Sequence, residues 1–142
     1  MKIEDVIRGK GTTVITASPD GTVADLVSLL AEHRIGAVVV SSDGLHIEGI
    51  VSERDIVRAL AERGADALRV SVREIMTSDV RTATPDDALE ETAHTMTVHR
   101  VRHIPITVDG ELRAIVSIGD IVKNRIDQLT DERNHLLGYL HT

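Results

Sequence analysis

The chain has 142 residues and a formal net charge of −7, with 42% hydrophobic and 27% charged residues, which is ordinary for a globular domain. With one tyrosine and no Phe or Trp, the chain has no aromatic platform for single-stranded nucleic acid. The absence of Cys excludes a disulfide and a thiolate site. The negative net charge argues against general binding to a phosphate backbone. No apolar run reaches membrane-spanning length, and acids stand where a signal peptide needs an apolar run, so a cytoplasmic protein without nucleic-acid or membrane partners is expected.

The first half of the chain alternates helical and strand patterns. Its expected elements, in order, are a short helix (3–7), a polar loop (8–13), a strand (14–16), a turn (18–21), a helix from Thr22 that Gly36 ends, a buried strand (37–40), a turn (42–44), a return strand (47–51) and a helix from Ser52 to about Glu62 closed by Gly64. Residues 65–68 are expected to link this half to the next.

The second half repeats the same order. A capping box from Ser71 to Glu74 is expected to open it. The further expected elements are a strand (80–82), a helix (85–99), two strands (104–108 and 112–116) joined by Asp109-Gly110, and a final helix from Ser117. That last helix is longer than its counterpart, and its leucines beyond Arg125 are expected to pack on the first half or on a second subunit.

Two strings show that the halves are copies of one unit. Gly-Ile-Val-Ser-Glu-Arg-Asp ends at Asp55, and Ala-Ile-Val-Ser-Ile-Gly-Asp ends at Asp120. Upstream, Ser-Pro-Asp around Pro19 and Thr-Pro-Asp around Pro85 lie 66 positions apart. A copy of about 60 residues is marginal as an independent fold. The two sheets are therefore expected to pack together about an approximate two-fold axis, with two equivalent clefts between the halves.

This set of motifs resembles tandem CBS domains, as in small stand-alone bacterial proteins. The resemblance rests on the element order, the two Pro-Asp turns, the paired strings and the strand starts Arg-Ile-Gly-Ala (34–37) and Arg-His-Ile-Pro (102–105), and it covers nearly the whole chain. It implies an α/β (α+β) fold of two strand-helix-strand-strand-helix repeats packed sheet to sheet with pseudo-two-fold symmetry. The first CBS domain would span 1–66 and the second, with the extended C-terminal helix, 67–142, together forming one CBS-pair (Bateman) module.

The resemblance also implies a ligand and a site. Such pairs typically bind AMP, ADP, ATP, NAD or S-adenosylmethionine between the repeats and often form disc-like homodimers. In one cleft the carry-over gives Asp120 for ribose with Ser117 and Gly119 beside it, and Thr12, Thr13, Ile35, Gly36 and Ala37 for adenine. In the other it gives Asp55 for ribose with Ser52 and Arg54 nearby, and Ser78, Val101 and His103 for adenine. The cations implied for phosphate are Lys10, Arg54, Arg102 and His103.

These residue types suit that chemistry. A carboxylate can accept both hydroxyls of a cis-diol through charge-assisted hydrogen bonds, and a helix N-terminus offers N–H groups to phosphate. Gly36 and Gly119 lack a Cβ, so the backbone could approach a flat ring. Ala114 replaces the counterpart of Gly49, and the first copy has no counterpart of Pro105. These differences predict clefts of unequal affinity.

Plainer interpretations remain open beside the site. Each Ser-x-x-Asp string is also a helix capping box, the better interpretation for a lone occurrence, and duplication favours a site. His94, His99 and His103 lack a convincing metal spacing, no nucleophile motif is present, and neither an enzyme nor a required cofactor is expected. The expected function is a regulatory nucleotide sensor that signals through conformational or dimer rearrangement to an unknown protein partner. The alternative is an architectural homodimer, built on the long C-terminal helix, without a physiological nucleotide.

Overall fold

The computed structural model describes residues 1–10 and 14–141. Its elements, in chain order, are α1 (Ile3–Ile7), β1 (Thr16–Ala17), α2 (Val23–His33), β2 (Ala37–Val40), β3 (Gly49–Ser52), α3 (Glu53–Arg63), the 3₁₀ helix η1 (Gly64–Arg69), α4 (Val72–Ile75), α5 (Leu89–His99), β4 (His103–Val108), β5 (Glu111–Ser117) and α6 (Ile118–Leu140). This order confirms the expected mixed α/β architecture with two copies of one unit.

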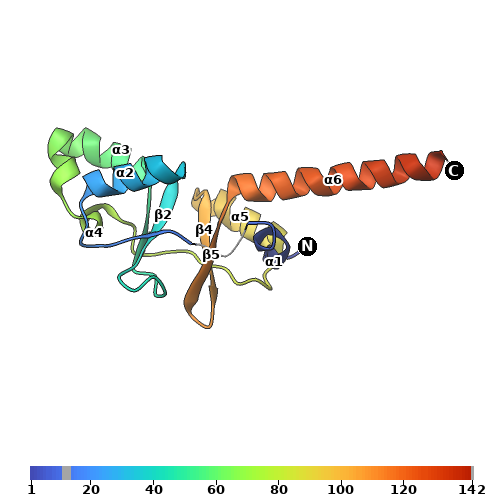
Figure 1. Ribbon diagram of the computed structural model, residues 1–142, viewed down its shortest axis with the longest axis horizontal. Helices are drawn as coiled ribbons and strands as arrows, with labels where there is room; N and C mark the ends of the chain where they lie inside the picture. Colours follow the sequence, from blue (N-terminus) through green and yellow to red (C-terminus); the bar gives the residue numbers. More distant parts are fainter. Residues whose placement is uncertain (11–13, 142) are drawn as a thin grey trace.

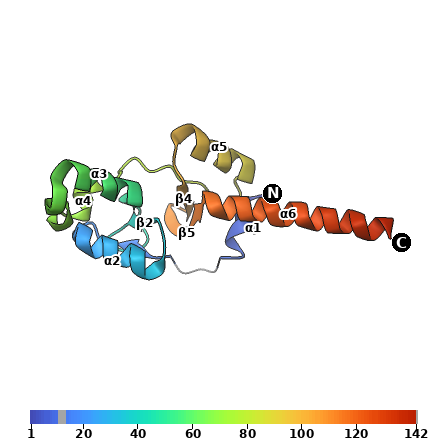
Figure 2. The same ribbon diagram turned by 90° about the horizontal axis from the view of Figure 1, so that it is seen from above.

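Two small sheets form the middle of the molecule. In the first, β1 runs parallel to β2 and β2 runs antiparallel to β3; in the second, β4 and β5 form an antiparallel hairpin. Helices α2 and α3 lie on the side of the first sheet that faces away from the hairpin, and α1 and α5 lie beside the hairpin (Figures 1 and 2). The sheets therefore stand next to each other with the helices outside.

The two copies are tied together by an exchange of their opening helices. The apolar side chains of α1, Ile3 and Val6, are buried in the core of the second copy, with Leu89, Ile104 and Val116. In return, Val72 of α4 is buried in the core of the first copy. Backbone hydrogen bonds fix both placements, including 3.0 Å from the Ile3 amide to the Asp87 carbonyl and 2.8 Å from the Val72 amide to the Gly21 carbonyl.

Several expected boundaries are wrong. Instead of a strand over 80–82, the structure has a single parallel bridge from Ala83 to Ile106. The next helix begins at Leu89, because residues 84–87 form a turn closed by hydrogen bonds between Thr84 and Asp87. Residues 65–68 belong to the 3₁₀ helix η1. The Ser71 side chain makes no capping hydrogen bond.

The ends of three elements in the first copy also differ from expectation. Helix α2 ends at His33, where Arg34 takes a left-handed conformation with φ of 54°, so Gly36 does not end it. Strand β1 lies slightly later than 14–16, and β3 begins at Gly49 and not at 47. The hairpin turn before β3 is longer than the pattern suggested.

Helix α6 leaves the body of the molecule. It begins against the second core through Ile121 and then projects away as a single rod (Figures 1 and 2). Its later leucines are exposed, with 48% of Leu129, 64% of Leu136 and 78% of Leu140 accessible. The expectation that they pack on the first copy is wrong, and packing on a second subunit stays a prediction. Within the described ranges, no helix is long and apolar enough to cross a membrane.

Candidate functional site

Each copy places its Ser-x-x-Asp string where a strand passes directly into a helix. Ser52 and Ser117 are the N-caps of α3 and α6, and each hydroxyl accepts a hydrogen bond from the amide of the Asp three residues later. In return, Oδ2 of each Asp accepts the amide of its Ser at 2.8 Å. The capping interpretation is therefore realised at both junctions, and one oxygen of each carboxylate is used in it.

Both junctions also open onto clefts between the copies. The first cleft, of about 470 Å³, lies between β3 and α3 of the first copy and Thr77, residues 79–81 and residues 99–103 of the second. The second cleft, of about 370 Å³, lies between Lys10, Val14, Ile15 and residues 34–37 of the first copy and β5 with the start of α6. Asp55 lines the first cleft and Asp120 the second, so capping and cleft-facing roles coexist in both acids.

Most of the residues implied by the resemblance come together in these clefts. The first cleft contains Ser52, Arg54, Asp55, Val101, Arg102 and His103. The second contains Lys10, Ile35, Gly36, Ala37, Ser117 and Asp120, and Gly36, Ala37 and His103 line both. Ser78 and Gly119 line neither cleft; Thr77 and Asp79, on either side of Ser78, line the first. Thr12 and Thr13 lie outside the described residues.

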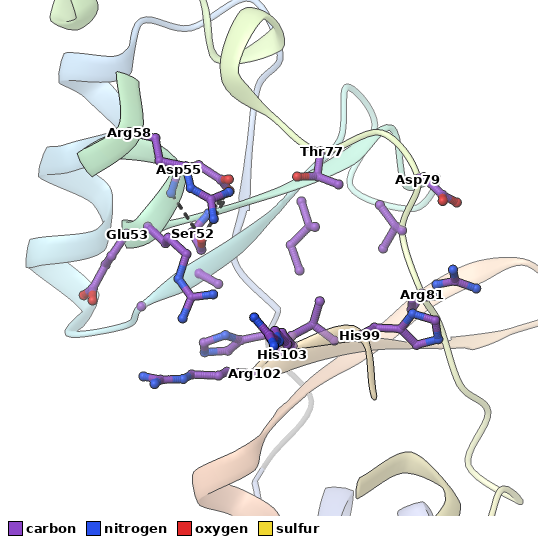
Figure 3. A pocket seen from close by; sticks show the side chains of 17 residues that line it. Ser52, Glu53, Asp55, Arg58, Thr77, Asp79, Arg81, His99, Arg102 and His103 are labelled. Atoms are coloured by element: carbon purple, nitrogen blue, oxygen red, sulfur yellow. Dashed lines mark hydrogen bonds between the residues drawn. The ribbon is translucent and has the colours of Figure 1, made fainter. Parts of the chain in front are cut away.

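The sequence reasoning missed a set of basic residues in the first cleft. Arg58 lies one helical turn after Arg54 on α3, and Arg81, His99 and Arg100 come from the second copy. Figure 3 shows Arg58 and Asp55 on one wall of this cleft, with Arg81, Arg102 and His103 on the other. The i, i+4 spacing of Arg54 and Arg58, just after the strand-to-helix junction, could have predicted that these two arginines lie on the same face of α3. No local spacing in the sequence predicts that Arg81, His99 and Arg100 face them from the second copy.

The second cleft contains an internal ion pair. The Lys10 ammonium contacts Asp120 Oδ2 at 2.5 Å and donates to the Ile115 carbonyl at 2.8 Å. Burial acts to raise the pKa of Asp120, but the hydrogen bonds from Lys10 and the Ser117 amide outweigh it and hold that pKa below its usual value. Asp120 is therefore ionised and already paired with a cation from the first copy.

His103 stands where the two clefts meet. Burial lowers its pKa below the ordinary 6.5, and the positive charge of Lys10 acts in the same direction. The imidazole is therefore mainly neutral at pH 7, able to donate one hydrogen bond and accept another. Among residues 1–10 and 14–141, no group of three or more His, Asp or Glu side chains is placed to hold a metal ion.

Comparisons with known proteins agree on one family. The family model of the CBS domain matches residues 3–62 and 72–127. The CBS domain-containing protein CBSX3, mitochondrial, of Arabidopsis thaliana is 32% identical over 146 residues, spanning 97% of this chain and 71% of the relative. The crystal structure of the CBS-domain protein ATU1752 from Agrobacterium tumefaciens is 39% identical, with a TM-score of 0.85 over 88% of this chain and 99% of that one.

A more distant likeness shares the fold. The CBS domain pair of the protein MJ0100, solved in complex with 5′-methylthioadenosine and S-adenosyl-L-methionine, has a TM-score of 0.77 at 24% identity. The alignment covers 87% of this chain and 98% of that one.

Proposed function

This chain belongs to the CBS-domain family, and on that premise we propose that it is a regulatory module that binds an adenosine nucleotide between its repeats. AMP, ADP, ATP and NAD are the candidate ligands. A CBS pair of the same fold has been solved with two adenosine compounds, which supports the adenosine part of the ligand. The proposed role is sensing and not catalysis, so bound nucleotide should be recovered unchanged after long incubation.

One observation carries the proposal: each cleft holds a carboxylate that has a free oxygen. The hydrogen bonds that Asp55 accepts through its side chain from described residues all go to Oδ2. The same holds for Asp120, whose Oδ2 accepts both the Ser117 amide and Lys10. Oδ1 of either acid can therefore take a ribose hydroxyl while the helix cap stays intact.

The remaining cleft residues have matching roles. In the first cleft, adenine would lie against Val101 and His103, and Arg54 and Arg102 would face phosphate. In the second cleft, adenine would lie against the backbone at Ile35 to Ala37. The signal would be a change in how the two repeats, 1–66 and 67–142, pack on each other, or in the geometry of a homodimer, which a protein partner reads.

Isothermal titration calorimetry with AMP, ATP and NAD tests this assignment. We expect Asp55→Ala and Asp120→Ala each to weaken binding in one cleft by about 10- to 100-fold, since each loses charge-assisted hydrogen bonds worth about 1.5–3 kcal/mol. Ser52→Ala and Ser117→Ala are matched controls, because they remove a cap but keep the carboxylate. Binding that neither Asp substitution weakens would refute the site.

A second candidate function, an architectural homodimer, is favoured by one feature of α6. Exposed apolar side chains recur along it at alternating spacings of four and three residues, at Val122, Ile126, Leu129, Leu136 and Leu140, with Arg133 in the remaining position of the series. This is the spacing of a coiled-coil seam, and a second copy could cover it. Sedimentation of the chain truncated after Arg125 tests this. Loss of the dimer together with no thermal shift from any nucleotide would favour the architectural function.

A further inference from the structure

The first cleft is unusually basic for this acidic chain. Five arginines line it: Arg54, Arg58, Arg81, Arg100 and Arg102. The carboxylates beside them are Glu53, Asp55 and Asp79. Five arginines against three carboxylates leave a formal surplus of two positive charges in this cleft, whereas the chain as a whole carries −7.

These arginines also differ from others in how they are paired. Outside the clefts, Arg8, Arg63 and Arg73 form ion pairs with acids 3.1 to 3.7 Å away. None of the five arginines in the first cleft has an ion pair or side-chain hydrogen bond with any described residue. Five guanidinium groups around one cavity, none of them in direct contact with a described carboxylate, are available to an anionic ligand.

The arginines surround the proposed ribose acid from both repeats. Arg54 and Arg58 belong to the same helix as Asp55, and Arg81, Arg100 and Arg102 belong to the facing segment of the second repeat. Figure 3 shows Arg58 and Arg81 on opposite sides of the cavity. A nucleotide whose ribose meets Asp55 would thus extend a phosphate chain among cations on two walls.

The second cleft is built differently. Its basic residues with fixed charge are Lys10 and Arg34, and the Lys10 charge is engaged by Asp120. A phosphate chain entering there would meet one guanidinium and an ammonium that already has a counter-charge. Electrostatic attraction to each added phosphate is therefore smaller in the second cleft than in the first.

From this contrast we infer that the first cleft selects its nucleotide by the length of the phosphate chain, binding adenosine di- and triphosphates in preference to the monophosphate. The second cleft discriminates little by phosphate number. The inference rests on the proposed function, because it assigns a ligand class to the Asp55 cleft.

Calorimetric titration with adenosine, AMP, ADP and ATP tests the inference, on the full chain and on Arg58→Gln/Arg81→Gln. We expect the native first cleft to bind ATP at least 10-fold more tightly than AMP, with a preference that falls as salt rises. The double variant should lose most of that preference, because removing two positive charges weakens ATP binding more than AMP binding. Arg69→Gln/Arg113→Gln is the matched control, since these two arginines also form no ion pair with a described residue but line neither cleft.

Inorganic tripolyphosphate separates the two proposals. Equal affinity for AMP and ATP in the first cleft, or equal loss of both in the Arg58/Arg81 variant, would overturn the selection while leaving adenosine binding intact. Tripolyphosphate that binds as tightly as ATP, with no binding of adenosine or AMP in either cleft, would uphold the basic site and refute the adenosine function. Failure of every probe to bind would refute both.

Discussion

Gly49→Ala is the substitution that most directly tests how closely the two repeats approach each other. A Cβ at this position would lie 2.7 Å from Met76 Sδ and 2.9 Å from the Thr77 carbonyl oxygen. Met76 can turn its side chain aside. The Thr77 carbonyl cannot move easily, because Thr77 and Ile50 exchange two backbone hydrogen bonds of 2.9 Å. The added methyl group therefore meets a fixed obstacle.

The expected cost of Gly49→Ala follows from two opposing contributions. Overpacking of this kind costs about 1–3 kcal/mol, and the loss of glycine's freedom in the unfolded chain returns about 0.5–1 kcal/mol. A net destabilisation of about 1–2 kcal/mol corresponds to a melting temperature lowered by about 3–6 °C for a chain of this size. Because Ile50 and Thr77 line the first cleft, ligand affinity there should fall as well.

Thermal unfolding and amide hydrogen exchange at Thr77 measure this effect. Gly36→Ala is the control for melting, since its Cβ would meet Glu53 atoms at an ordinary 3.6 Å or more, and we expect no fall in melting temperature. The second repeat already accommodates Ala114 at the corresponding place, buried with 5% exposure. An unchanged melting temperature in Gly49→Ala, with unchanged exchange at Thr77, would refute the close-approach reasoning.

Three further predictions concern single contacts. Lys10→Met should raise the pKa of Asp120 in a carboxyl NMR titration, because the ammonium no longer opposes the effect of burial. In the native chain, the lowered pKa means that ionised Asp120 stabilises the fold at pH values above its unfolded pKa. This stabilisation is lost as the pH falls through the folded pKa. An unchanged pKa would argue against the contact. Arg34→Gly should stabilise the chain by about 1 kcal/mol in thermal melts, because Arg34 is held at φ of 54°, whereas Arg34→Ala should give no such gain. By NMR titration, the pKa of His46 should lie above 6.5 and return toward 6.5 in Asp43→Asn, since the Asp43 carboxylate 2.6 Å away favours the imidazolium. The stabilisation that protonated His46 contributes is lost as the pH rises through this raised pKa. An unshifted His46 pKa would contradict the His46–Asp43 ion pair.

The repeat and its two junctions could be predicted because their information is local. A strand that ends in Ser-x-x-Asp specifies its own helix cap, and its recurrence 65 residues later, from Asp55 to Asp120, marks the copy. The apolar run at 37–40 likewise predicted a strand that is buried throughout. The start of α5 was predicted too early for a local reason as well. The sequence Thr-Pro-Asp-Asp suits both the first turn of a helix and the separate turn that it forms in the structure.

The charged character of the clefts could not be predicted in the same way. Lys10 meets Asp120 across 110 positions of the chain, and Arg81 joins Arg58 only because the two repeats face each other. Neither partner has a sequence pattern that selects the other. The resemblance named the acids and part of the basic set, while the count and pairing of the arginines required the assembled fold.

The exchanged helices α1 and α4 have a consequence for the order in which this chain can fold as it leaves the ribosome. The first core is completed by Val72, so it can close only when residues beyond α4 have been synthesised. Helix α1 is made before β4 and β5, yet it packs on side chains of those strands, which follow about 100 residues later. During translation, Ile3 and Val6 therefore remain without their native neighbours until β4 and β5 have been made, and these two apolar side chains stay unburied in the nascent chain until then.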